Sequence, residues 1–360
     1  MFNPKAYINL NHLRSNISYL RSISNNAELF PVIKADAYGH GSLRIAEELV
    51  KMNISTVCVA TYLEIKELIE SKISIDVLHL GKISYAKFDI YFNQNVIVTV
   101  NSIEDVDKIC LLTKDKNKSI RCYIKLDTGM NRMGCKEEEF DTIYKKIITN
   151  DLISLEGIYS HLSSSNNIES PSNKKQFKMF LKIINTLKNS SLKFHILNSA
   201  GIFNFNEFSL SAVRPGLSIY GISPICINNN LKPIMKLKAP IVHLKKVLNG
   251  ESIGYDCKYL AEDDINIAII QCGYADGLSK DFENNGLVFF RKKKYSIIGK
   301  ISMDLFAIDC KEDTFQINDE VTIWGGNSSN SQLESISEKY SSIPYVYLTN
   351  LSKRIERVYV

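Results

Sequence analysis

The sequence predicts an α/β protein with an N-terminal (β/α)8 TIM-like barrel over residues 1–230 and a C-terminal, mainly-β domain over residues 231–360. Three observations lead to this prediction: the chain length, a repeated strand-and-helix pattern in the first part, and closely spaced strands after about residue 231. The 360 residues suit two domains at about 150 residues each, although an α/β barrel can occupy about 250 alone. We therefore expect one large unit and one smaller unit.

The first part of the chain repeats a short β-branched or aromatic run, a polar turn and a segment with apolar residues at helical spacing. Alternating strands and helices specify parallel pairing through right-handed crossovers, and eight strands close a (β/α)8 barrel. A doubly wound open sheet is the alternative. The eight strand-like runs cover residues 28–35, 56–62, 75–81, 96–102, 120–128, 155–162, 192–199 and 210–216.

The pattern changes after about residue 231, where strand-like runs follow one another with little room for helices. Two Asn-Gly pairs, at residues 249–250 and 285–286, suit the positive φ of tight hairpin turns. A polar tract at residues 325–342 predicts one surface helix. The strand-like runs cover residues 240–248, 264–272, 287–292, 295–301, 305–310 and 320–324.

Composition excludes several classes of protein. The chain is 45% hydrophobic and 23% charged, which is typical of a globular protein and not of a disordered one. Its formal net charge of +5 is scattered along the sequence, so nucleic acid is not an expected partner. The eight cysteines form no C-x-x-C pair, which argues against a zinc site. No signal-peptide pattern and no apolar run near the roughly 20 residues of a membrane span are present, so we expect a reduced, cytoplasmic protein without a membrane contact.

Polar residues at the ends of the predicted strands are candidates for chemistry, because reactive groups of a (β/α)8 barrel stand there. Lys34 ends the first run and precedes a polar, glycine-containing break, after which a helix is expected from about Ser42. Neighbouring cations and a low dielectric constant can lower the pKa of such a lysine and make it a Schiff-base nucleophile. A lysine that extends into solvent is the alternative interpretation. The other polar strand ends are Lys125, Asp127, His161, Asn198, Ser199 and Arg214.

The string PVIKADAYGHG (31–41) closely resembles the pyridoxal-phosphate lysine motif of the alanine racemases, a family with an N-terminal barrel and a C-terminal β domain. Further strings resemble the remaining signatures of that family, in the same order and over essentially the whole chain. They are KLDTGMNRMG (125–134), LEGIYSHL (155–162), HILNSAG (195–201), VRPGLSIYG (213–221), GESIGY (250–255), GYADG (273–277), GKISMD (299–304) and RVYV (357–360).

The resemblance implies a two-base racemisation of alanine. Lys34 would bind pyridoxal 5'-phosphate as a Schiff base and act as the base for the D face, and Tyr255 would be the base for the L face. Two groups are needed because one fixed base cannot easily remove a proton from one face of a carbon and return it to the other. In the family this tyrosine comes from the partner subunit, so a homodimer is implied.

The resemblance also assigns residues that hold the cofactor. Arg214 is expected to face the pyridine nitrogen, where an arginine can only donate, and His161 is expected to lie by the ring and hydrogen-bond Arg214. The phosphate would take backbone N–H groups and hydroxyls. The predicted cofactor-binding residues are Lys34, Tyr38, His161, Asn198, Ser199, Arg214, Gly216, Leu217 and Tyr345.

A third set of residues is implied to contact the substrate. Arg132 is expected to hold the phenolic oxygen of the cofactor or the substrate carboxylate, and Lys125 matches a lysine that is often carbamylated in the family and would then orient Arg132. A narrow entrance would select small substrates. It would be formed by Tyr274 with Met303 and Asp304 from the other subunit.

The predicted function is therefore a cytoplasmic, homodimeric racemase that interconverts L- and D-alanine and supplies D-alanine for peptidoglycan. No metal ion is expected. A racemase of broader specificity, acting on serine or basic amino acids, is one alternative, and such enzymes often carry secretion signals. A non-catalytic pyridoxal-phosphate carrier is another, but such proteins resemble only the N-terminal half and lack the β domain.

Overall fold

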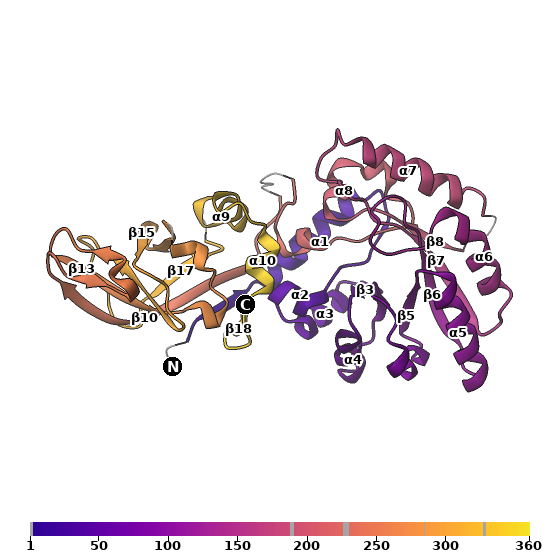
Figure 1. Cartoon of the computed structure of the whole chain (residues 1–360), viewed down its shortest axis with the longest axis horizontal. Coiled ribbons are helices and arrows are strands. Elements are labelled where there is room, and N and C mark those ends of the chain that lie inside the picture. Colours follow the sequence, from indigo (N-terminus) through magenta and orange to yellow (C-terminus); the bar gives the residue numbers. More distant parts are fainter. Residues whose placement is uncertain (1–2, 188–190, 226–229, 284, 327–328) are drawn as a thin grey trace.

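The protein is elongated, with a barrel at one end and a β domain at the other (Figure 1). The computed structural model describes residues 3–187, 191–225, 230–283, 285–326 and 329–360. In the described part, no helix has the length and apolar character needed to cross a membrane.

Eight parallel strands form the barrel, which confirms the predicted (β/α)8 architecture and excludes the open sheet. Six of them pair in the order β3-β4-β5-β6-β7-β8, and β2 pairs with β9. The parallel bridges Val32 with Cys58 and Asn198 with Arg214 join the two sets into a closed ring. The strands are β2 (Glu28–Leu29), β3 (Thr56–Val59), β4 (Asp76–His79), β5 (Val96–Val100), β6 (Ile120–Lys125), β7 (Ile153–Tyr159), β8 (Lys193–His195) and β9 (Ala212–Val213).

Helices cover the outside of the barrel, and several short helices sit at the strand ends. The helix predicted from about Ser42 is present as α3, and its buried side chains include Ile45, Ala46 and Leu49. The helical elements are α1 (Leu10–Ile23), α2 (Lys34–Gly39), α3 (Ser42–Lys51), α4 (Tyr62–Glu70), η1 (Tyr85–Phe92), α5 (Ile103–Lys116), α6 (Glu137–Ile148), α7 (Pro171–Ile184), α8 (Ser199–Asn204), η2 (Asn206–Phe208) and η3 (Leu217–Tyr220).

Strands β2 and β9 are much shorter than the runs that predicted them. Pro31 and Pro215 lie in these runs, and a proline has no N–H to donate to a neighbouring strand. Their carbonyls still accept: Cys58 donates to Pro31 at 2.8 Å and Val32 donates to Pro215 at 2.9 Å. The backbone therefore leaves regular strand geometry just before Lys34.

The turn α2 after Val32 and Ile33 is left-handed, which the sequence did not predict. Residues 35–38 have φ near 52° and ψ between 44° and 53°. Each non-glycine residue in this region costs roughly 1–2 kcal/mol, so contacts from elsewhere must hold the turn. One such contact is at Gly39, where a Cβ atom would lie 2.2 Å from the carbonyl oxygen of Leu348.

The C-terminal domain is mainly β, as predicted. Its eight-stranded sheet has the order β13-β16-β15-β14-β17-β10-β1-β18, and β13 also pairs with β10. Its elements are β10 (Met235–Val247), β11 (Ser252–Ile253), η4 (Tyr255–Cys257), β12 (Tyr259–Leu260), β13 (Ile265–Gln271), η5 (Tyr274–Asp276), η6 (Lys280–Glu283), β14 (Leu287–Phe290), β15 (Lys293–Ile298), β16 (Leu305–Asp309), β17 (Glu320–Trp324), η7 (Ser329–Ser331), α9 (Leu333–Lys339), α10 (Pro344–Thr349) and β18 (Glu356–Tyr359).

The N-terminal strand β1 (Lys5–Ile8) belongs to this second sheet, where it pairs antiparallel with β10 and parallel with β18. A division of the chain at residues 230 and 231 therefore stays a proposal, with β1 as an exception to it. The predicted surface helix is present as α9.

The two Asn-Gly pairs form turns but not the predicted hairpins. Gly250 has a φ of 81° and Asn285 a φ of 62°. However, β10 pairs with β13 rather than with β11, and Asn285 follows the helix η6 rather than a strand. The hairpin prediction was wrong because a positive φ identifies a turn and not the partner of the strand before it.

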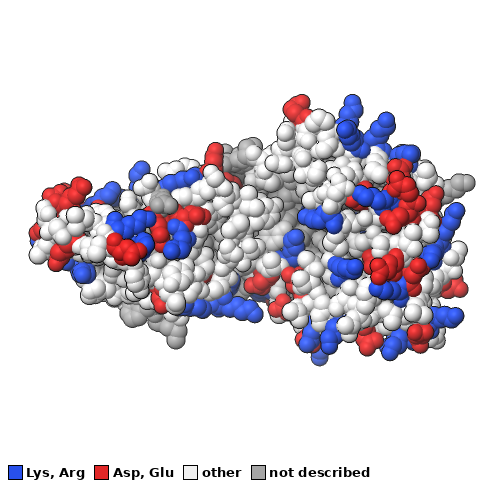
Figure 2. Space-filling view, in the orientation of Figure 1, with Lys and Arg blue, Asp and Glu red and all other residues white. Residues whose placement is uncertain are grey.

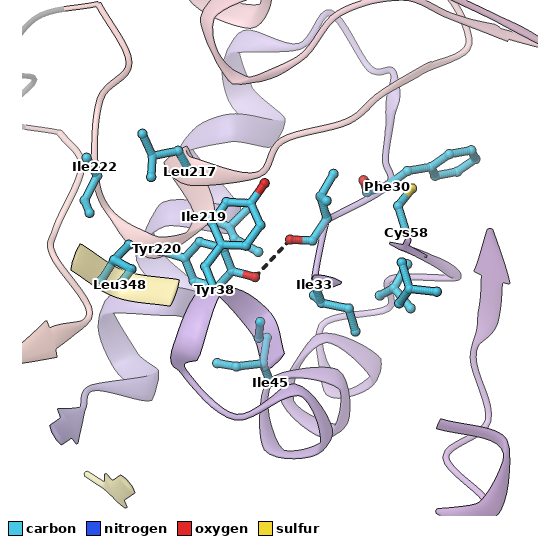
Figure 3. Packing of buried hydrophobic residues seen from close by; sticks show 14 of the residues in the cluster. Phe30, Ile33, Tyr38, Ile45, Cys58, Leu217, Ile219, Tyr220, Ile222 and Leu348 are labelled. Atoms are coloured by element: carbon cyan, nitrogen blue, oxygen red, sulfur yellow. Dashed lines mark hydrogen bonds between the residues drawn. The ribbon is translucent and has the colours of Figure 1, made fainter. Parts of the chain in front are cut away.

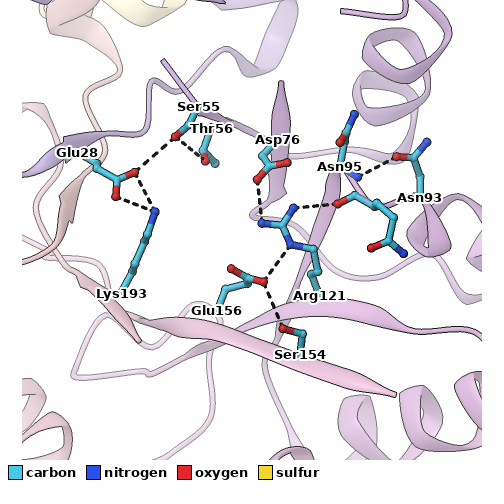
Figure 4. Close-up of polar contacts among 11 residues, drawn as sticks. Glu28, Ser55, Thr56, Asp76, Asn93, Asn95, Arg121, Ser154, Glu156 and Lys193 are labelled. Atoms are coloured by element: carbon cyan, nitrogen blue, oxygen red, sulfur yellow. Dashed lines mark hydrogen bonds and ion pairs between the residues drawn. The ribbon is translucent and has the colours of Figure 1, made fainter. Parts of the chain in front are cut away.

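An ion-pair network ties the N-terminal ends of the barrel strands together (Figure 4). Arg121 on β6 donates to Asp76 at 2.8 Å and to Glu156 at 3.0 Å. Lys193 on β8 pairs with Glu28 on β2 at 2.7 Å. Elsewhere on the face shown in Figure 2, basic and acidic side chains are interspersed. This end of the barrel serves stability.

Replacing Arg121 with Met should lower the free energy of unfolding by about 1–3 kcal/mol, because Asp76 and Glu156 would lose their partner while only about a quarter exposed. Urea unfolding measures the change. The control is Lys193→Met, whose more exposed pair with Glu28 should contribute less than about 1 kcal/mol. An equal fall in the free energy of unfolding in both variants would contradict the prediction that Arg121 contributes more to stability than Lys193.

Candidate functional site

A cavity of about 370 Å³ opens at the C-terminal ends of the barrel strands. Ten of the residues predicted from the sequence line it, and they come from seven separate places in the chain. They are Lys34, Tyr38, Lys125, Arg132, His161, Asn198, Ser199, Arg214, Gly216 and Tyr345. An adjoining cavity of about 700 Å³ shares several of these side chains and is also lined by Leu217.

Four predicted residues do not line these cavities: Tyr255, Tyr274, Met303 and Asp304. All belong to the C-terminal domain, and Tyr255, Tyr274 and Met303 are 68%, 44% and 53% exposed. Within one chain, nothing brings them to the barrel cavity. Asp304 is partly buried and pairs with Arg354 at 2.7 Å. The roles of all four residues stay predictions.

Lys34 is the first residue of α2 and lies within the cavity lining. The carboxylate of Glu64 accepts a hydrogen bond from the backbone N–H of Ala35 at 2.6 Å and so helps to hold the turn. Burial, and next the nearby guanidinium of Arg132, lower the pKa of Lys34 below the usual lysine value. A larger fraction of the amine is therefore neutral, as a nucleophile or base requires.

Arg214 follows β9 and is buried among neutral acceptors. It donates to the carbonyl of Ser160 at 2.5 Å and to that of His195 at 3.2 Å, and it also contacts the ring nitrogen Nδ1 of His195. The predicted hydrogen bond to Nδ1 of His161 is present at 3.4 Å. Burial, and next the charge of Arg214, lower the pKa of both histidines well below the usual value, so neutral rings accept from the guanidinium.

Three hydrogen-bond donors converge beside the cavity. The backbone N–H groups of Gly216 and Ser218 donate to the hydroxyl oxygen of Ser199 at 2.9 and 3.3 Å, and the Ser218 hydroxyl lies 3.0 Å from the same oxygen. Gly216 leaves room for Tyr38, because a Cβ atom there would lie 2.7 Å from the tyrosine hydroxyl and would force the ring to shift. The ring of Tyr345 lies 5.5 Å from that of Tyr38.

Asn198 has a structural role that the sequence did not indicate. Its side-chain oxygen accepts from the N–H of Gly201 at 2.9 Å, which caps helix α8, and from the hydroxyl of Ser165 at 2.8 Å. Asn198 therefore lines the cavity, but its side-chain oxygen is already used by these two hydrogen bonds.

Lys125 stands at the end of β6, almost fully buried. Burial, and next the charges of Arg214 and Arg132, lower the pKa of Lys125 to about 8. Asp127, two residues on, pairs with Lys136 at 2.9 Å, and its charge offsets the lowering of the Lys125 pKa only in part. The site is therefore rich in cations, which favours an anionic ligand.

Sequence reasoning missed several residues of the site. Tyr159 lies under two cations, with Arg214 4.8 Å and Lys125 5.6 Å from its ring centre. Its position two residues before His161 on a strand indicates the same side of the sheet and could have identified it. No comparable signal identifies the other lining residues that were missed, which are Val32, Ala60, Leu80, Gly81 and Met133.

The lining fits the cofactor that the sequence resemblance implies. Pyridoxal phosphate carries an aldehyde, a phosphate and a ring nitrogen, and the cavity offers a buried amine at Lys34, the donors around Ser199 and Gly216, and the guanidinium of Arg214. Figure 3 shows Tyr38 with Leu217 and Tyr220 packed around this end of the barrel. Among the described residues, no group of three His, Cys, Asp or Glu side chains could hold a metal ion.

Comparisons with known families match both parts of the chain. A family model described as "Alanine racemase, N-terminal domain" matches residues 8–224, and one described as "Alanine racemase, C-terminal domain" matches residues 234–359. Among curated relatives, alanine racemase 1 of Clostridium acetobutylicum is 34% identical over alignments covering 99% of this chain and 95% of that protein. The alanine racemase of Clostridium tetani has the same identity and coverage.

Solved structures agree in fold over the whole chain. Alanine racemase of Clostridium difficile 630 superimposes with a TM-score of 0.92 at 29% identity, covering 100% of this chain and 96% of that one. A structure of alanine racemase from Bartonella henselae with covalently bound pyridoxal phosphate has a TM-score of 0.90 at 28% identity, covering 99% of each chain.

Proposed function

This chain belongs to the alanine racemase family, and from that premise we propose that it interconverts L- and D-alanine with pyridoxal phosphate as cofactor. The D-isomer would supply peptidoglycan synthesis. One observation carries the proposal: Lys34, with a lowered pKa, lines the same cavity as Arg214 and the donors around Ser199.

The residues of the cavity would share the work as follows. Lys34 would hold the cofactor covalently and move the Cα proton on the D face. Ser199, Gly216, Leu217, Tyr38 and Tyr345 would hold the phosphate, and His161 and Asn198 would complete the lining. Arg214 can only donate, so it would hydrogen-bond the ring nitrogen without giving it a proton. When bound, pyridoxal phosphate withdraws electrons from Cα and so makes its proton more acidic.

The proton on the L face requires a second base, and we propose Tyr255 of a partner subunit in a homodimer. The exposure of Tyr255 supports this assignment, because a large apolar ring that is 68% exposed in one chain is available for a contact with another.

The entrance to the site would also be shared between subunits. Tyr274, Met303 and Asp304 would limit the substrate to a small amino acid, and Arg132 would hold its carboxylate or the phenolic oxygen of the cofactor. Contacts within the C-terminal domain support a common role: Tyr274 donates its backbone N–H to Ser302 at 3.2 Å, and Ala275 donates to Met303 at 3.0 Å. A cytoplasmic location is part of the proposal, and the free cysteines among the described residues suit a reducing compartment.

The function is tested by measuring racemisation of a panel of amino acids with the purified, cofactor-loaded protein. We expect turnover of L- and D-alanine to exceed that of serine, lysine and arginine. Equal turnover across the panel would indicate a broader racemase, and cofactor binding without any turnover would indicate a carrier protein.

Carbamylation of Lys125 is a further part of the proposal. With a pKa of about 8, roughly a tenth of this amine is neutral at pH 7 and can add to CO2, releasing one proton and leaving an anion beside Arg132. We expect a carbamate carbon in the ¹³C NMR spectrum with ¹³CO2, growing as pH rises through 8 at a constant concentration of dissolved CO2. The signal should be absent from Lys125→Met. The same signal in that variant would exclude this lysine.

A further inference from the structure

A small cavity lies where the barrel meets the C-terminal domain, and the residues that line it include three buried polar atoms. They are Nε2 of His40, Nε1 of Trp324 and Oε2 of Glu334, and none has a hydrogen-bond partner among the residues that the structure describes. His40 and Trp324 are fully buried. Unpaired buried polar atoms are rare in native proteins, so three of them around one cavity need a common explanation.

The three atoms come from different parts of the fold. His40 follows the left-handed turn α2 that begins with Lys34, Trp324 ends strand β17, and Glu334 lies in helix α9. Of these elements, α2 belongs to the barrel and the other two belong to the C-terminal domain.

The hydrogen-bonding character of each atom follows from its surroundings. Nδ1 of His40 lies 2.8 Å from the carbonyl oxygen of Ala37, so this nitrogen carries the proton. Burial lowers the pKa of His40 to about 4, which keeps the ring neutral at pH 7 and leaves Nε2 as an acceptor. The indole N–H of Trp324 can only donate. The other oxygen of Glu334 already accepts from the N–H of Ser223 at 3.2 Å.

The size and the mixed polarity of the cavity decide what fits. Its volume for the centre of a water molecule is about 10 Å³, which is about the least that holds one water. A cation would gain nothing from Trp324, because an indole N–H can only donate a hydrogen bond. A water molecule can accept from this N–H and donate to the two acceptors.

We propose that this cavity is the binding site of one ordered water, which accepts a hydrogen bond from Trp324 and donates to His40 and Glu334. The water gives a partner to each of the three atoms at once. It makes Trp324, Glu334 and His40 positioning residues rather than catalytic ones.

The water would connect the C-terminal domain to the backbone on both sides of Lys34. On one side, His40 holds the carbonyl of Ala37 within the strained turn. On the other side, the ring of His40 stacks on Tyr220 at 4.5 Å, and the hydroxyl of Tyr220 donates to the carbonyl of Val32 at 2.9 Å. Loss of the water would weaken the support of the turn rather than remove a reacting group.

The chain offers a direct probe, because Trp324 is its only tryptophan and therefore gives a single indole N–H signal in a ¹⁵N NMR spectrum. In the cofactor-loaded protein we expect a through-space cross peak from this N–H to water. A crystal structure should show one water at about 2.7–3.2 Å from each of the three atoms. An empty cavity, or a direct bond from Trp324 to His40 or Glu334, would overturn the proposal.

Two substitutions at one position provide a matched pair. Glu334→Gln keeps an oxygen for Ser223 and a polar group for the water, so the cross peak should remain. Glu334→Leu removes both, so the indole signal should shift, the cross peak should weaken, and Tm should fall by about 2–4 °C.

The exposed Glu338 of the same helix provides the control, since Glu338→Leu should leave the indole signal unchanged. An unchanged indole signal in Glu334→Leu would count against the water. If Glu334→Leu does not fold, the presence of the water is decided by the crystal structure of the parent and by the NMR spectra of the parent and of Glu334→Gln.

Discussion

Lys34→Ala should lose both the absorbance of bound pyridoxal phosphate and the racemisation of alanine, with a fall in kcat of about 10⁴-fold or more. The amine at this position is the group that we propose to hold the cofactor covalently, and it also moves the proton on one face. Both roles disappear together, which makes this the largest effect expected of any single substitution. Absorbance after gel filtration and a chiral assay of alanine measure the two losses.

A matched control for this variant is Lys193→Ala. Lys193 lies on β8 at the opposite end of the barrel and pairs with Glu28, so its loss should leave cofactor binding and turnover near the parent values. Retention of cofactor absorbance and activity in Lys34→Ala would refute the proposed role of Lys34.

Tyr255→Phe should lower racemisation by about 10²–10⁴-fold while the cofactor stays bound, because only the proton transfer on the L face is lost. Exchange of the Cα proton with solvent deuterium should stop when the substrate is L-alanine and continue when it is D-alanine. Since Tyr255 is mostly exposed in one chain, loss of its hydroxyl should leave the folding of that chain intact.

The nearby Tyr259→Phe, on strand β12, controls for general effects of losing a tyrosine hydroxyl and should retain activity. Exchange from L-alanine at the parent rate in Tyr255→Phe would show that another group is the base for the L face.

Mixing the two variants tests the shared site. If Tyr255 acts in the partner's barrel, a heterodimer of Lys34→Ala with Tyr255→Phe contains one site with both groups intact. After subunit exchange in an equal mixture, about a quarter of the parent activity should return. If subunits exchange but no activity returns, then either Lys34 and Tyr255 act in a site of the same chain or Tyr255 takes no part in the mechanism.

Much of the site could be predicted because parallel barrels bring strand ends together. Lys125, His161 and Arg214 lie at or just after the ends of strands that are far apart in the sequence, and each lines the same cavity. The family resemblance was needed for Tyr345, since it reaches the cavity from helix α10 of the C-terminal domain and follows no barrel strand. His195 was also missed as a partner of Arg214, because nothing in its local sequence indicates which way its ring points.

The order of apolar and polar residues by itself determined the eight barrel strands, the second β domain and the residues at the strand ends, because these depend on periodicities of two and 3.6 residues that act locally. Tertiary structure alone decided three other features. The N-terminal strand pairs with the C-terminal sheet, and the turn after Lys34 is left-handed. Burial lowers the pKa values of Lys34 and Lys125, helped by the charge of Arg132 at Lys34 and by those of Arg214 and Arg132 at Lys125. Each of these depends on contacts between residues distant in sequence, which local preference does not encode.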